Sequence, residues 1–148
     1  MRRFLVFLAC TGLLAGCTEK SPGAPSTFQP GVTGTWAGDL MVDGVTGRMT
    51  WTLVQTDSTV GGPVLVSLPN GTVLMNGFLT GTLTGTTLQY LINVQPGGIP
   101  TRPECGGQLA GTMTVAVGLP STLSGPMAIT SSTCVLPLTG PSLTLVKQ

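Results

Sequence analysis

Side chains that could do chemistry are few in this 148-residue chain. Histidine is absent, which removes the commonest general base and metal ligand. Asp39 and Asp43 are expected on the outer face of a strand and in its turn, where Arg48 could pair with either at the surface. Glu104 beside Arg102 is expected in a solvated loop. No nucleophile elbow, phosphate-binding loop or metal-ligand set stands out. The chain is therefore predicted to be no enzyme, with no catalytic residue, metal site or cofactor.

The start of the chain predicts export. Met1 to Arg3 is a short positive stretch, and Phe4 to Leu14 is an apolar run too short to span a bilayer. The sequence Leu14-Ala15-Gly16-Cys17 then follows and resembles the lipobox of bacterial lipoproteins. This resemblance covers about the first 18 residues and implies cleavage before Cys17, with lipid attached to its sulfur. The alternative is an ordinary secretory signal in which Cys17 stays a plain thiol.

The lipobox resemblance also implies a location. Lipoproteins of this kind carry two or three acyl chains, which hold a protein stably on a membrane. Thr18, rather than Asp, follows the cysteine, and by the sorting rule of enteric bacteria this favours the periplasmic face of the outer membrane in a host with two membranes. Pro, Gly and Ser dominate residues 18–31. The predicted organisation is a signal peptide over 1–16, a flexible tether over 17–31 and one domain over 32–148.

The four cysteines separate into three roles. Cys10 leaves with the signal peptide and Cys17 takes lipid, so Cys105 and Cys134 remain in an oxidising compartment. Such a pair predicts a disulfide, because two cysteines without histidine form a poor metal-ligand set.

Composition limits the partners of the mature chain. Four basic residues oppose five acidic ones after residue 17, a net charge of 4 − 5 = −1: Lys20, Arg48, Arg102 and Lys147 against Glu19, Asp39, Asp43, Asp57 and Glu104. There is no basic patch for nucleic acid. Charged residues make up only 7% of the chain, whereas 24 threonines suit the outer faces of strands.

Apolar residues alternate with polar ones throughout the domain, and no helical stripe occurs. The alternation predicts about eight strands joined mostly by short turns, including turns at Asn70-Gly71 and Thr84–Thr86. A bulge is expected near Gly77, and Pro63 is expected to make its strand an edge or a bulged strand. The predicted fold is all-β, a small antiparallel meander barrel, with a β-sandwich as the alternative.

A short pattern, apolar–small–Gly–Thr/Pro–apolar, recurs at Val32–Trp36, Leu79–Leu83, Leu109–Met113 and Leu123–Met127. Glycine within a strand is unfavourable unless it permits a bend or close packing, and a small barrel needs both. The alternative is that an abundance of glycine and threonine produces the pattern by chance.

A hairpin is predicted around Gly118–Ser121, with Cys105 and Cys134 stapling its open end. The two cysteines are symmetric about the tip, but symmetric pairing would turn Leu109 to the face of Thr130. A one-residue bulge, placed at Pro126, would repair the register, and so would cysteines lying just past the paired strands.

Gly34-Thr35-Trp36 resembles the Gly-x-Trp signature of lipocalins and the Gly-Thr-Trp of avidins, both eight-stranded ligand-binding barrels. The lipocalin pattern adds an arginine packed on this tryptophan and a helix after the barrel. Arg102 is no evident counterpart, and the last predicted strand runs to Lys147-Gln148. Ligand-binding residues are therefore not transferred, and Trp36 and Trp51 are expected in the core.

These features predict a lipid-anchored, non-catalytic barrel of the cell envelope that binds a small apolar ligand or an envelope partner. The alternatives are a structural or interaction module without a ligand and a carboxylate-dependent enzyme.

Overall fold

The computed structural model describes residues 29–42, 44–135, 138–139 and 142–148, and the described part is all-β. Cys17 and Asp43 lie outside the described residues. The strands are β1 (Gly34–Val42), β2 (Val45–Thr56), β3 (Thr59–Ser67), β4 (Val73–Thr84), β5 (Thr87–Val94), β6 (Gly107–Ala116), β7 (Thr122–Ser132), β8 (Leu138–Thr139) and β9 (Ser142–Lys147).

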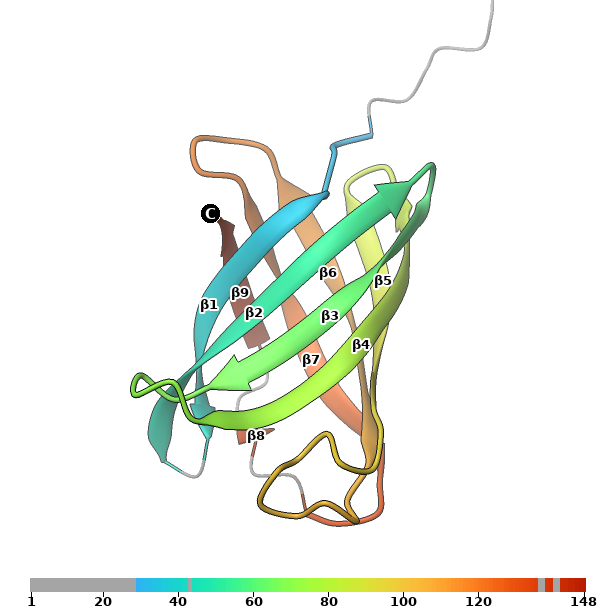
Figure 1. Ribbon diagram of the computed structural model, residues 1–148. Helices are drawn as coiled ribbons and strands as arrows, with labels where there is room; N and C mark the ends of the chain where they lie inside the picture. Colours follow the sequence, from blue (N-terminus) through green and yellow to red (C-terminus); the bar gives the residue numbers. More distant parts are fainter. Residues whose placement is uncertain (1–28, 43, 136–137, 140–141) are drawn as a thin grey trace, which may run out of the picture.

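The sheet closes into the predicted eight-stranded antiparallel barrel (Figure 1). Neighbours from β1 to β7 pair in chain order, and β7 then pairs with β9. β1 closes the ring by pairing with β2 on one side and with β9 and β8 on the other. The short β8 and β9 thus share the eighth position, and the sandwich alternative is not the fold of this chain.

Alternation along the strands fills the barrel with apolar side chains. Inward positions on every long strand form one hydrophobic cluster, which includes both tryptophans, and no polar or charged residue is buried among the described residues. The largest fully buried side chains are Trp36, Trp51, Met49, Leu53, Leu79, Leu83, Leu88, Ile92, Leu109, Met113, Leu123 and Leu143. Burial of this apolar area is the main stabilising term of the fold.

Inward glycines let neighbouring strands approach closely, as the repeated pattern predicts. A Cβ built on Gly111 would lie 2.1 Å from the Pro126 carbonyl oxygen, and one on Gly125 would lie 2.0 Å from that of Thr112. Gly38 approaches Thr144 of β9 in the same way, with 2.0 Å from the built Cβ to the carbonyl oxygen. These positions exclude any side chain, because the backbone of the neighbouring strand lies against them.

Both ends of the barrel are covered. At the entry end, where the chain enters β1, Val32 is fully buried and the Gln29 amide donates to the Leu83 carbonyl (2.8 Å). Pro30 is also buried, so the last residues of the predicted tether pack on the domain, whereas residues 17–28 lie outside the described part. At the far end, the loop after β5 places Ile99 in the core, and the Asn76 amide nitrogen donates to the Gly98 carbonyl (2.7 Å).

Two local predictions about β3 and β4 are wrong. Pro63 does not mark an edge or a bulge, because β3 pairs with both β2 and β4. The β2–β3 ladder instead skips the positions of Gly62 and Pro63, as expected for a residue that lacks an N–H. The bulge in β4 falls at Leu74 rather than at Gly77, since Val66 pairs with Met75 and Ser67 with Val73. The Asn70-Gly71 turn is confirmed.

The β6–β7 hairpin contains the bulge that its cysteines require, but at Thr130 rather than at Pro126. Leu109 pairs with Ile129, whereas Gln108 pairs with Ser131, so Thr130 is the extra residue. The ladder ends at Gly107 and Ser132, and Cys105 and Cys134 lie two residues beyond it. The hairpin therefore has both a one-residue bulge and cysteines that lie past the paired strands.

A methyl group at Gly125 tests how closely the backbones of β6 and β7 approach each other. We expect Gly125→Ala to lower the free energy of unfolding by about 2–3 kcal/mol or more, because its Cβ must displace the β6 backbone. Gly61→Ala on β3 is the matched control, since the nearest atom to its Cβ lies at 3.4 Å, and it should cost less than about 1 kcal/mol. Urea unfolding measures both, and equal effects would contradict close packing at Gly125.

Candidate functional site

Trp36 lies in the core at the entry end and is braced from two directions. Its indole nitrogen donates to the Val32 carbonyl oxygen (2.7 Å). The Lys147 ammonium, on the strand paired with β1, lies 5.4 Å from the ring centroid, within the range of a cation–π contact. The tryptophan of the Gly-Thr-Trp motif therefore holds the entry end together. Lys147 was not predicted to be in this position, although the inward alternation through Leu143 and Leu145 leads to it.

Trp51 packs in the middle of the barrel against Tyr90. The ring centroids are 5.0 Å apart and the planes are tilted by 60°. The Tyr90 hydroxyl donates to the Pro126 carbonyl (3.2 Å), and burial raises the pKa of this hydroxyl above its usual range. The Trp51 indole N–H finds no acceptor among the described residues, which costs about 1–3 kcal/mol. Both tryptophans are core residues, as predicted.

The predicted disulfide is present. Cys105 and Cys134 are bonded with their Cα atoms 5.7 Å apart, and Cys105 is buried against the core. The bridge joins the loop after β5 to the segment after β7, so it holds the far end of the β6–β7 hairpin closed.

The candidate carboxylates Asp39 and Glu104 lie on the surface. Asp39 is exposed on β1 and stands opposite Arg48 in the β1–β2 ladder, but among the described residues the two side chains form no ion pair. The Arg48 guanidinium donates to the Gln148 side-chain oxygen (3.3 Å). Glu104 is exposed in the loop before Cys105, while Arg102 donates to the Val135 carbonyl (2.8 Å). Among the described residues, no three Cys, Asp or Glu side chains gather into a metal-binding group.

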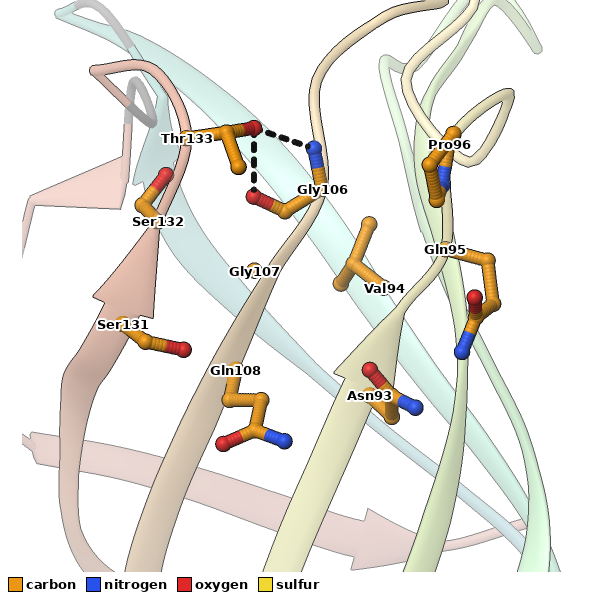
Figure 2. A pocket seen from close by; sticks show the side chains of 10 residues that line it. All are labelled: Asn93, Val94, Gln95, Pro96, Gly106, Gly107, Gln108, Ser131, Ser132 and Thr133. Carbon is orange, nitrogen blue, oxygen red and sulfur yellow. Dashed lines mark hydrogen bonds between the residues drawn. The ribbon is translucent and has the colours of Figure 1, made fainter.

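An open hollow of about 380 Å³ lies on the outer wall near the far end, where β5, β6 and β7 meet the disulfide loops, and it is lined by both polar and apolar groups (Figure 2). Gly106 and Gly107 are among the residues that line it. The Thr133 hydroxyl donates to the Gly106 carbonyl (3.1 Å) and accepts from the Gly106 N–H (3.0 Å). The Thr133 side chain thus joins the segments after β7 and before β6 that border the hollow.

Amide and hydroxyl side chains line this hollow in a row across three strands. Asn93 pairs with Gln108, and Gln108 pairs with Ser131, so these side chains stand side by side, as Figure 2 shows. Among the described residues, the side-chain amides of Asn93, Gln95 and Gln108 make no hydrogen bond. Each offers a donor and an acceptor without charge. The hollow can therefore form hydrogen bonds with a neutral polar group, and it lacks the means for acid–base chemistry.

Sequence reasoning did not find this hollow. Its side chains come from three consecutive strands and are of types that usually cover strand surfaces, so neither residue type nor spacing distinguished them.

None of the protein families, curated proteins or solved structures with which the chain was compared matches it. No helix in the described part of the chain is long and apolar enough to cross a membrane.

Tyr90 is the one tyrosine of the chain, so its titration can be followed directly. We expect no phenolate absorbance from the folded protein at about pH 11, whereas the urea-unfolded chain should ionise near pH 10. Because the folded pKa is the higher one, stability is complete below the unfolded pKa and is lost as the pH rises above it. Tyr90→Phe should abolish the phenolate signal and this part of the pH dependence. Ionisation of the folded protein near pH 10 would contradict the burial of the hydroxyl.

Proposed function

We propose that this protein is a membrane-anchored lipoprotein of the bacterial cell envelope, whose non-catalytic barrel binds an envelope partner through its outer surface. The observation that carries the anchor is Leu14-Ala15-Gly16-Cys17 directly after an apolar run, followed by a Pro/Gly/Ser-rich segment. The described part of the chain begins at Gln29, among the last residues of that segment, and these residues pack on the barrel. An anchored position on the periplasmic face of the outer membrane follows from Thr18 if the host has two membranes.

The packing of the barrel favours a partner over an interior apolar ligand. Large side chains from all long strands meet in the interior, and both ends are covered by chain. A ligand inside would have to displace tightly packed side chains, which costs several kcal/mol. The outer wall instead carries the neutral hollow around Gln108, whose amides can bind a polar partner by hydrogen bonds.

The proposal includes a resemblance of the barrel to lipocalins. Gly34-Thr35-Trp36 stands at the start of β1, and a cation from the last strand lies over the tryptophan ring. In this chain the cation is Lys147 rather than an arginine. The alternative function is a structural module of the envelope that uses the same barrel without a bound partner.

Replacement of Cys17 tests the anchor. Mass spectrometry of the protein from its native host should find the mature N-terminus at Cys17 with acyl chains attached, and the protein should stay with membranes after a high-salt wash. Cys17→Ser should remove the acyl mass and block cleavage at this position, because the lipid is added to the sulfur. Cys10→Ser is the matched control and should change neither property. Cleavage of Cys17→Ser like the wild type would instead indicate an ordinary secretory signal.

Site-specific cross-linking in whole cells tests the partner. A photoreactive residue in place of Gln108 should give one adduct of discrete mass, because this position lines the hollow between Asn93 and Ser131. The same residue in place of Thr52, exposed on β2, should give none. Absence of an adduct at position 108 would contradict partner binding at the hollow and favour the structural module.

A further inference from the structure

The tip of the β6–β7 hairpin is apolar and projects into solvent. Leu119 has a relative exposure of 105%, Val117 is 62% exposed, and Pro120 is also exposed. No charged residue occurs from 116 to 121. The Ser121 hydroxyl braces the turn by donating to the Gly118 carbonyl (3.1 Å) and accepting from the Gly118 N–H (3.3 Å). Exposed apolar side chains on such a tip are unfavourable in water, and they indicate a surface that contacts another protein or a membrane.

This tip lies at the entry end of the barrel. Figure 1 shows the β6–β7 loop at the same end as the start of β1 and the C-terminus. Hydrogen bonds link the three segments, because the Lys147 amide donates to the Ser121 carbonyl (3.0 Å) and the Gln148 amide donates to the Thr35 carbonyl (2.9 Å). The tip is therefore held rigidly next to the point from which the chain leads back to Cys17.

We propose that Val117, Leu119 and Pro120 insert into the lipid surface to which Cys17 is anchored, so that the barrel stands with its entry end against the membrane. This inference rests on the proposed anchor. Residues 17–28 can span at most about 40 Å when fully extended, which keeps the entry end close to the bilayer. The tip is the most exposed apolar group at that end, and its transfer from water to the acyl boundary is favourable.

The charges around the tip fit a lipid headgroup layer without dominating the contact. Lys147 lines the shallow hollow beside Leu119 and Pro120, but its ammonium lies over the buried Trp36 ring, 5.4 Å from the ring centroid. Asp57, in the β2–β3 turn at the same end, carries the opposite sign. Apolar insertion, rather than attraction to anionic lipid, therefore carries the proposal.

Depth measurement on the acylated full chain tests the insertion. Cys17 is blocked by lipid and Cys105 is bonded to Cys134, so one introduced cysteine takes a polarity-sensitive fluorophore at a single place. The labels go to Leu119→Cys and Val117→Cys, with the protein in vesicles of phosphatidylethanolamine and phosphatidylglycerol. We expect blue-shifted emission and strong quenching by spin-labelled lipid at both positions.

Two control labels should remain in water. Val45→Cys is matched to Val117→Cys, because Val45 is also an exposed valine (53%) but begins β2 at the far end of the barrel. Thr72→Cys is exposed in the turn between β3 and β4 at the far end. Neither should respond to spin-labelled lipid. Far-UV circular dichroism of each labelled protein shows whether the barrel is folded.

Two results would overturn the insertion while leaving the anchor intact. In the first, the acylated protein stays on the vesicles but the label at position 119 behaves like that at position 72. In the second, emission at position 119 is blue-shifted without quenching by lipid, which means that protein, such as a second copy of the chain, covers the tip. Absence of acyl chains on Cys17 would overturn the anchor together with the insertion, and mass spectrometry of the same sample distinguishes that case.

Discussion

Closure of the sheet at β1 is the constraint on which the structure depends. A sheet with one apolar face must cover that face, and eight strands can do so by curling until the first meets the last. In this protein β1 pairs with β2 along its whole length, but on its other side it meets β9 near its start and β8 near its end. Gly38 lies between these two contacts, where the backbones of β1 and β9 approach too closely for a side chain. The inward glycines Gly111 on β6 and Gly125 on β7 likewise leave room for the backbone of the neighbouring strand.

A barrel closed this tightly has consequences for function. The inward side chains meet across a narrow space, and segments at both ends pack on them, so binding by side chains is left to the outer wall and the loops. On the wall, polar character comes from amides and hydroxyls rather than from charges, which suits hydrogen bonds to neutral groups. The tryptophans, which might have formed a ligand platform, brace the core instead: Trp36 by Val32 and Lys147, and Trp51 by Tyr90.

Much of the architecture was predictable from local pattern. Alternation of apolar and polar residues placed the strands, and the turns at Asn70-Gly71 and Thr84–Thr86 stand where their residue types indicated. The positions of the bulges were harder to predict. The symmetry of Cys105 and Cys134 required a one-residue correction in the hairpin, yet it could not choose Thr130 over Pro126, because it fixes the sum of the paired positions and not the place along β7 where the extra residue lies. Pro63 misled for a related reason. Whether a strand is an edge depends on a partner distant in the chain, and here the ladder skips the proline instead.

The sequence by itself determined the all-β class, the pairing of Cys105 with Cys134 and the expectation of a lipid anchor at Cys17, because each depends on residue type and spacing along the chain. Tertiary structure alone decided the rest. It brought Asn93, Gln108 and Ser131 into one row, set Lys147 over Trp36, and placed the apolar hairpin tip beside the start of β1. These contacts join residues that are far apart in sequence, so they exist only once closure has set the register and curvature of every strand.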